Sequence, residues 1–282
     1  ASFTAWREST FPGLLANVVA GRIANRLDLG GANCTVDAAC ASSLAALNLA
    51  ASELHARNAD LMLCGGADAI NALFMYMCFS QTPALSASDA CRPFCETADG
   101  TMMGEGCGLL ALMRLADAER DGVPIHAVIR GIGASSDGRG SSVYAPRGAG
   151  QAKAIRRALG QASLSPEDIS LVEAHGTGTR AGDLAEFEGL AEVFGRDRVG
   201  RRRFCALGSI KSQIGHTKSA AGAAGLIKAT LALQHRVLPP TLNVLRPNPK
   251  LRIEETPLYL NTECRPWIAP AGRPRRAGVS SF

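Results

Sequence analysis

Residues 33–47 read NCTVDAACASSLAAL, a short stretch with strand character that runs into a cysteine and then into an apolar periodic run. We expect CTVD (34–37) to be a strand and residues 39–57 an alanine-rich helix, which places Cys40 where a strand gives way to a helix. The free N–H groups and dipole of a helix start favour a thiolate. A backbone N–H there could also hold an oxyanion. The alternative for Cys40 is a buried structural thiol.

Strand and helix patterns alternate through the rest of the chain. Strands are predicted at 60–66, 108–115, within 126–137, at 169–175 and at 204–212, and helices at 13–27, 150–162, 182–194 and 219–234. Such alternation indicates an α/β protein with parallel or mixed sheets. A break near 121–124 divides the chain into two halves, 1–122 and 123–282, with no flexible linker between them.

Two histidines share the setting of Cys40. His175 ends a buried strand in EAHGTGT, and His216 precedes a helix in SIKSQIGHTKSAAG. Either histidine alone could be a satisfied core residue. Together with Cys40 they repeat one layout, in which a reactive residue follows a strand and precedes a helix, and active sites of α/β sheets gather at such strand ends. His126 and His235 lack this setting and are expected to be structural or exposed.

Composition limits the classes of function. The net charge is +5 with dispersed basic residues, and the run RDRVGRRR (196–203) lacks interleaved aromatic residues, so it suits a loop or an acidic partner better than nucleic acid. Nine irregularly spaced cysteines suit reduced, cytoplasmic thiols, and without a CxxC pair no metal site is predicted. The N-terminus has no apolar signal core, and the most apolar segment (220–233) is too short to span a membrane.

Three other enzyme classes fit the sequence poorly. The dinucleotide fingerprint fails in GEGCGL, where Leu109 holds the third glycine position, and in GIGASS, where Ser136 does. A phosphate-binding loop fails because Lys211 lacks the preceding glycine. A serine hydrolase would need a G-x-S-x-G motif, which the chain lacks.

The motifs VDAACASSLAAL (36–47), EAHGTGTRAGD (173–183) and GSIKSQIGHTKSAAG (208–222) resemble the three signature blocks of β-ketoacyl synthases. Further similarity lies in ANVVAGRIANRLDLGG, RPFCETADGTMMGEGCGLLAL and LPPTLNVLRPNP. The resemblance covers nearly the whole chain and is nearest to bacterial iterative synthases of the polyketide, polyunsaturated-fatty-acid and enediyne kinds. It implies a thiolase-like fold of two similar α/β halves, with mixed five-stranded sheets in an α/β/α/β/α arrangement.

The resemblance also implies roles for particular residues. Cys40 matches the acyl-accepting nucleophile, and His175 and His216 match the pair that assists decarboxylation of a malonyl extender. Lys211 matches the lysine that organises the site. Thr177 and Thr179 match threonines that line the phosphopantetheine arm of an acyl carrier protein, so no cofactor of the domain's own is expected. The implied partners are that carrier, an acyltransferase and other synthase domains of one polypeptide, and a second copy in a homodimer.

Two relatives of this family remain alternatives. A catalytically silent partner, like a chain-length factor, typically lacks the nucleophile, whereas a thiolase usually pairs it with a second cysteine and one histidine. The chain departs from the family pattern at Cys95, where Asp is common, and at Gln213, where Asn is. It stops at GVSSF, before a glycine-rich turn that usually supplies a second oxyanion donor and a gating Phe, and Phe282 is not assigned that role. We therefore expect a fragment, truncated at both ends, that folds poorly and is inactive alone.

Overall fold

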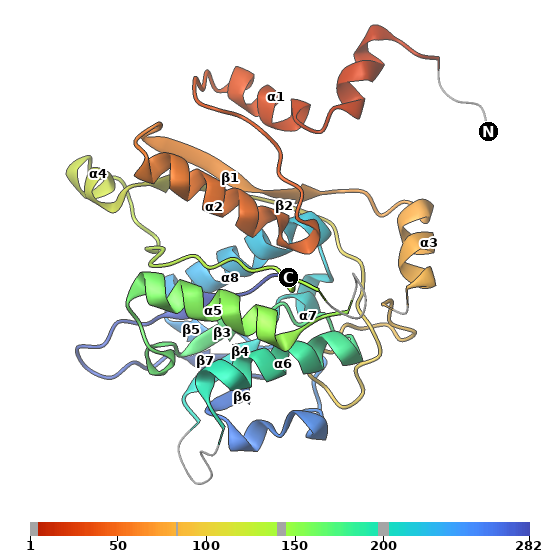
Figure 1. Cartoon of the computed structure of the whole chain (residues 1–282), viewed down its shortest axis with the longest axis vertical. Helices are drawn as coiled ribbons and strands as arrows, with labels where there is room; N and C mark the ends of the chain where they lie inside the picture. The colour runs from red at the N-terminus through yellow and green to blue at the C-terminus, as the bar shows by residue number, and fades with distance from the viewer. Residues whose placement is uncertain (1–4, 83, 140–144, 197–202) are drawn as a thin grey trace.

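The computed structural model describes residues 5–82, 84–139, 145–196 and 203–282 (Figure 1). Its helices are α1 (Val18–Arg26), α2 (Ser42–His55), α3 (Leu73–Gln81), α4 (Leu115–Arg120), α5 (Gly148–Ala162), α6 (Arg180–Phe194), α7 (Lys211–Ile214) and α8 (Ala221–His235). Its strands are β1 (Leu61–Asp68), β2 (Gly106–Met113), β3 (Leu171–Glu173), β4 (Cys205–Gly208), β5 (Val237–Leu238), β6 (Leu258–Leu260), β7 (Arg265–Pro266) and β8 (Ala277–Val279). Most of the basic run predicted to be a loop or docking surface, at 197–202, lies outside the described residues.

The N-terminal half is organised around an antiparallel hairpin. β1 pairs with β2 so that Leu61 lies opposite Met113 and Asp68 opposite Gly106. One face of β1 packs on α2, where Cys64 contacts the cluster of Leu47 and Ala50. The strands predicted at 60–66 and 108–115 are therefore confirmed, each displaced by one or two residues.

The C-terminal half contains a parallel sheet in the order β6-β4-β3-β8. Side chains alternate across it, as the period of two in a strand requires. Val172 and Leu207 join the apolar cluster that includes Phe187 of α6, whereas Leu171 and Ala206 lie in the opposite cluster with part of α8. This alternation buries both faces of the sheet. The strands predicted at 169–175 and 204–212 are present but shorter, and Lys211, at the end of the second prediction, begins α7.

The elements stack in layers that place the helix starts near the strand ends. The hairpin, the helices α2 and α8, the parallel sheet, and the helices α5 and α6 follow one another (Figure 1). α1 lies beyond the hairpin at the N-terminal end (Figure 1). In the described part of the chain no helix is long and apolar enough to cross a bilayer.

Two predicted strands are wrong. Residues 32–37 are extended, but within the described chain they make no backbone hydrogen bond to a neighbouring segment. Residues 123–139 also lack a strand. Two of their backbone groups bond to side chains of α5 instead: the N–H of Ile132 donates to Gln161 (2.5 Å) and the carbonyl of Ala134 accepts from Arg157 (2.6 Å). Gly133 permits this approach, since a Cβ there would lie 2.0 Å from a carbonyl of α5.

The remaining differences concern size. The two main sheets hold two and four strands among the described residues, where five were expected in each half. The helix predicted at 13–27 begins only at Val18, because Gly13 and Leu14 belong to the 3₁₀ segment Glu8–Leu14 and residues 16–17 form a turn before α1.

Candidate active site

Cys40 lies in a tight 3₁₀ turn immediately before α2. Ala39 has a φ of +50°, a left-handed conformation that is uncommon for a residue with a Cβ. Two side chains hold the turn: Asp37 Oδ1 accepts the N–H of Ala39 at 2.9 Å, and the hydroxyl of Ser42 donates to the carbonyl of Ala39 at 2.7 Å. The thiol is therefore presented from a fixed turn at the start of a helix, as the sequence predicted, although the strand expected before it is absent.

The structure brings the three predicted reactive side chains together. The ligand atoms of Cys40, His175 and His216 all lie within 4.8 Å of one another. The two imidazole rings meet edge to face, with centroids 5.4 Å apart and an interplanar angle of 85°. His175 follows β3 and His216 follows α7, so the ends of separate elements converge on the turn that carries Cys40.

A buried carboxylate fixes the backbone at His175. The two side-chain oxygens of Glu186, on α6, accept the N–H groups of His175 (2.8 Å) and Gly176 (2.7 Å). Gly176 has a φ of +44°, and a Cβ there would lie 2.6 Å from the side chain of Ser209. Only glycine fits this turn, and the carboxylate holds it in place.

Two donors approach Nδ1 of His175. Lys211 Nζ donates to the carbonyl of His175 at 2.5 Å and lies 3.5 Å from Nδ1 of the same residue. The backbone N–H of Phe282 lies 3.4 Å from that nitrogen. An ammonium and an amide can only donate, so Nδ1 acts as an acceptor and the proton of the neutral ring is on Nε2.

His216 has the same tautomer for a different reason. Its Nδ1 accepts the backbone N–H of Lys218 at 3.0 Å. The backbone N–H of His216 donates to the carbonyl of Met102 at 2.6 Å, and the backbone carbonyl of His216 accepts the N–H of Gly104 at 3.0 Å. Both imidazoles therefore carry their proton on Nε2.

Burial and nearby cations keep both rings neutral. Burial, with the charge of Lys211 and the neighbouring ring of His216, places the pKa of His175 well below its ordinary value. Burial and the charges of Lys211 and Lys218 lower the pKa of His216 to about 3. At neutral pH the pair offers two N–H donors.

The thiol differs from its sequence prediction. Burial raises the pKa of Cys40, and the charge of Lys211 only partly opposes this. The helix start was expected to favour the thiolate, but desolvation of the buried charge is the larger effect. Burial also lowers the pKa of Lys211, opposed by the carboxylates of Glu186 and Glu173.

The cluster of one thiol and two imidazoles is compact enough to suggest a metal centre, but its protonation argues against one. A metal-binding histidine usually donates its other ring N–H to a carboxylate or carbonyl. Here Nδ1 of both His175 and His216 accepts a hydrogen bond, which leaves Nε2 protonated. The ammonium of Lys211 beside His175 would also repel a dication.

Thr177 and Thr179 lie beside this cluster. Their hydroxyl oxygens are 2.9 Å apart. Both line the same cavity as Cys40, of about 3380 Å³, whereas Lys211 lies behind its wall. This volume is several times that of a pocket for a small ligand, so size alone does not identify a substrate.

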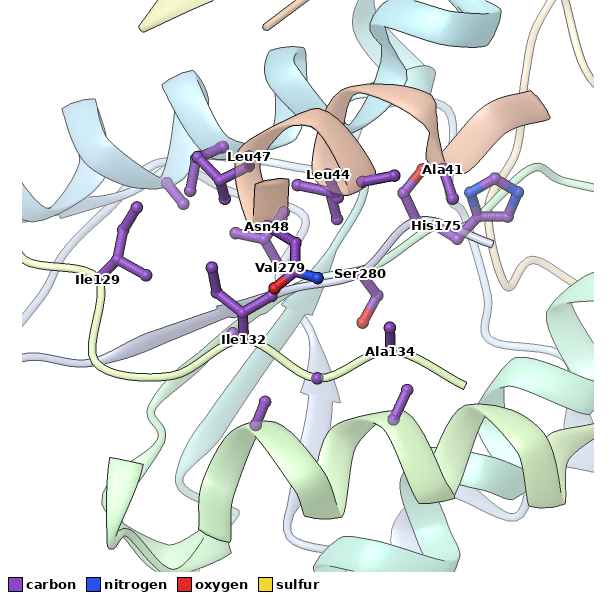
Figure 2. A pocket seen from close by; sticks show the side chains of 18 of the residues that line it. Ala41, Leu44, Leu47, Asn48, Ile129, Ile132, Ala134, His175, Val279 and Ser280 are labelled. Carbon is purple, nitrogen blue, oxygen red and sulfur yellow. The ribbon is translucent and has the colours of Figure 1, made fainter. Parts of the chain in front are cut away.

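The cavity wall becomes apolar away from the histidines. Figure 2 shows side chains of α2, of β8 and of the extended segment after α4 around one part of it, with His175 at one end. Leu44 and Leu47 project from α2, and Ile132 from the extended segment (Figure 2). The reactive groups therefore adjoin a hydrocarbon-lined surface.

Sequence reasoning missed several residues that shape the site. Glu186 and Asp183 lie on α6, which matches the helix predicted at 182–194, and both are buried with a pKa raised to about 7 by desolvation. An acidic residue on the apolar stripe of that helix was the available signal. Ser281 and Phe282 approach Cys40 and His175 from the end of β8, and no sequence pattern indicated this contact.

Two family profiles match the chain. The profile described as β-ketoacyl synthase, N-terminal domain, matches residues 4–118, and that of the C-terminal domain matches residues 126–245. The chain is 48% identical over its full length to a polyunsaturated fatty acid synthase polypeptide of Thraustochytrium sp., of which it spans 10%. It is 46% identical over 96% of its length to polyketide synthase GfsE of Streptomyces halstedii, of which it spans 7%.

Solved ketosynthases share the fold. The ketosynthase from module 6 of the bacillaene synthase of Bacillus subtilis 168 superposes with a TM-score of 0.92 and 40% identity, over 99% of this chain and 51% of that one. The oxazolomycin ketosynthase domain OzmH KS7 of Streptomyces albus JA3453 gives 0.89 and 36%, over 98% and 49%. The predicted thiolase-like fold is confirmed, and the chain spans about half of these domains. With both of its halves matched, the chain belongs to the β-ketoacyl synthase family.

Proposed function

We propose that this chain carries β-ketoacyl-[acyl-carrier-protein] synthase activity, an acyltransferase reaction of fatty-acid or polyketide synthesis. An acyl group passes to Cys40, a malonyl thioester loses CO₂, and the resulting enolate attacks the acyl-enzyme to form a 3-oxoacyl thioester. The observation that carries this proposal is the convergence of one thiol with two imidazoles, His175 and His216, within 4.8 Å.

Cys40 would be the acyl acceptor. Its sulfur attacks the carbonyl carbon of the incoming thioester, the carrier sulfur leaves, and the thiol proton of Cys40 ends on the released carrier thiol. A thiolate is a strong nucleophile even when it is a minor species. The positive charge of Lys211 favours that thiolate when it forms.

His175 and His216 would stabilise the enolate. When the bond to CO₂ breaks, its electron pair passes to the thioester carbonyl, whose oxygen becomes negative. Two Nε2–H groups donate to that oxygen, and no proton needs to be removed from the substrate. Donors fixed in a dry site cost no reorganisation at this step. The enolate carbon then attacks the acyl carbonyl and releases the thiolate of Cys40.

The substrates would arrive on the phosphopantetheine arm of an acyl carrier protein. The paired hydroxyls of Thr177 and Thr179 offer donors and acceptors to such an arm at the edge of the histidine cluster. The apolar wall seen in Figure 2 suits a hydrocarbon chain better than a charged ligand. Acyltransferase and other synthase domains would act beside this one.

We also propose a homodimer. Residues 32–37 are extended and mostly exposed, and within the described chain no segment pairs with them. An unpaired edge of this kind favours strand addition. Antiparallel pairing with the same residues of a second copy would provide the missing hydrogen bonds and would form the strand that the sequence predicted at 34–37.

We propose that the two halves of the chain carry different functional residues. Residues 1–122 would be the half that carries Cys40, and residues 123–282 the half that carries both histidines. The cytoplasm is the proposed compartment, because all nine cysteines are free in the structure and a reactive thiol needs reducing conditions.

The test is acylation followed by condensation in the protein that contains this chain. After incubation with an acyl-carrier substrate, intact mass should show one acyl adduct, which Cys40→Ala should abolish together with condensation. Cys264→Ala, which removes an exposed thiol, is the matched control and should keep both. An equal adduct in the Cys40 variant would refute the assignment. An unmodified protein that shows neither acylation nor condensation would indicate a catalytically silent partner instead.

A further inference from the structure

Lys218 is a charged residue in an unusual place. It lies two positions after His216, in the 3₁₀ turn Lys218–Ala220 that leads into α8. It is only 7% exposed, and its φ of +50° lies in the left-handed region. Burial of a charge and a strained backbone are both unfavourable, so they persist only where surrounding contacts impose them.

The side chain of Lys218 has a complete set of partners. Its Nζ forms an ion pair with Asp68 Oδ1 at 3.0 Å and donates to Asn71 Oδ1 at 2.7 Å and to the carbonyl of Gly104 at 2.9 Å. An ammonium has three protons, and each has an acceptor here. These acceptors lie at the end of β1 and just before β2, so the side chain joins the turn to the N-terminal hairpin.

The same set of contacts holds His216. The backbone N–H of Lys218 donates to His216 Nδ1 at 3.0 Å. Gly104 accepts from Lys218 Nζ through its carbonyl and donates to the carbonyl of His216 through its N–H, at 3.0 Å. The ring nitrogen, the backbone of His216 and the ammonium therefore belong to one closed network.

We propose that Lys218 is a positioning residue for His216. The anchored side chain of Lys218 holds the turn in place, and in this turn the backbone N–H of Lys218 keeps Nδ1 of His216 an acceptor. The proton on Nε2 of His216 therefore faces Cys40 and His175. The proposal deepens the proposed function and rests on it in one respect, namely that the Nε2 proton of His216 would stabilise the enolate. Lys218 itself touches no reacting atom.

The charge of Lys218 adds a second effect. The groups that face His216 are Cys40 from the turn before α2, His175 after β3, Lys211 of α7 and Lys218. Asp68 lies behind Lys218, and Glu105 accepts the N–H of Asn71 at 2.9 Å. The ammonium of Lys218 disfavours a proton on the ring, in the same direction as burial. The ring thus remains a neutral donor.

The test follows the ring nitrogens of His216 in ¹⁵N-histidine-labelled protein, with the signals assigned by their loss in His216→Asn. In the unmodified protein we expect a neutral ring with its proton on Nε2 down to strongly acidic pH. In Lys218→Met the imidazolium should appear at higher pH, mixed tautomers should become visible, and malonyl decarboxylation should slow about 10- to 100-fold, by analogy with lost outer-shell partners of metal-binding histidines. Asp68→Asn should shift the ring titration the opposite way, because it leaves the lysine charge uncompensated.

The controls separate this positioning role from a general loss of folding stability. Lys228→Met removes another buried lysine, which pairs with Glu173 at 2.8 Å, and should lower stability without moving the His216 signals. If Lys218→Met does not fold, the opposite-sign shift in Asp68→Asn still decides the matter. Unchanged His216 signals in both variants would overturn the positioning role, whatever the protein catalyses. Shifted signals in a protein that releases no CO₂ would uphold it and refute the proposed function.

Discussion

The hydroxyl of Ser281 donates a hydrogen bond of 2.6 Å to the backbone carbonyl of Cys40. This contact joins the end of β8 to the turn before α2, although the two residues lie at opposite ends of the sequence. Phe282 continues the same approach, with its ring centroid 6.0 Å from that of His175. The turn that carries Cys40 is therefore held by the C-terminal half as well as by its own residues.

Ser281→Ala should loosen the turn that presents the thiol. A net loss of about 1 kcal/mol in unfolding free energy is expected for one buried hydrogen bond. Alkylation of Cys40 by iodoacetamide should change in rate, because the thiol would sample more orientations. Ser280→Ala is the matched control, since the backbone N–H of that residue, rather than its hydroxyl, makes the hydrogen bond to Glu173. Identical behaviour of the two variants would contradict a specific role for Ser281.

Decarboxylation should depend on the Nε2–H groups of both histidines. His175→Ala or His216→Ala should slow CO₂ release from a malonyl carrier by about 10²–10³, the typical effect of removing one fixed donor to an oxyanion. Some acylation of Cys40 should remain, because that step does not use the enolate site. Radiolabelled CO₂ release and intact mass separate the two steps. Normal CO₂ release in both variants would mean that the histidines are structural.

The pH dependence of decarboxylation should lack the ionisation of an ordinary histidine. The pKa of His216 is lowered to about 3 and that of His175 lies well below its usual value, so both rings stay neutral as pH falls through 6.5. The rate should therefore show no loss centred near pH 6.5 in a profile measured from pH 5 to 8. A loss there that disappears in His216→Ala would show that the ring titrates normally.

Lys211→Met should make the thiol of Cys40 less acidic. The lysine charge lowers the pKa of that thiol against the effect of burial, so its removal leaves desolvation unopposed. Each unit of increase in pKa reduces the thiolate fraction about tenfold. The alkylation rate of Cys40 as a function of pH measures this directly, with the exposed Lys250→Met as control. Coincident profiles for Lys211→Met and the unmodified protein would exclude the electrostatic effect.

Glu186→Gln should alter both stability and its pH dependence. An amide has one acceptor oxygen, so one of the two N–H groups at His175 and Gly176 would lose its partner, at a cost of about 1–3 kcal/mol. The folded-state pKa of Glu186 is raised to about 7 from an ordinary 4.5. The folded protein thus holds a proton that the unfolded chain releases, and this contribution to stability is lost as pH rises from 4.5 through 7.

The measurement is urea unfolding of both proteins at pH 4.5, 6 and 7.5. Relative to the unmodified protein, Glu186→Gln should lose less stability as pH rises across this window, because glutamine does not titrate. The neighbouring Glu188→Gln, on the exposed side of α6, should leave the slope unchanged. Parallel pH dependence in Glu186→Gln and the unmodified protein would show that the carboxyl titrates normally.

The sequence by itself determined the α/β class, most of the helices, the strands at β1 to β4 and the three side chains that the structure brings together. Alternating apolar residues in β3 and β4 and a polar residue at each strand end are local patterns, and local patterns survive without the rest of the fold. His175 was found for that reason, and Cys40 and His216 were found because each lies just before a helix. Their chemical roles remain predictions.

Only the tertiary structure decided the rest. Residues 34–37 and 126–137 have strand-like sequences, but a strand also needs a neighbour, and the neighbours of these segments are not set by their own residues. The side-chain contacts of Ser281 and Lys218 join elements far apart in the chain, so no spacing reveals them. The acidity of Cys40 was misjudged because desolvation depends on every atom packed around the sulfur, whereas the favourable helix start is visible in the sequence.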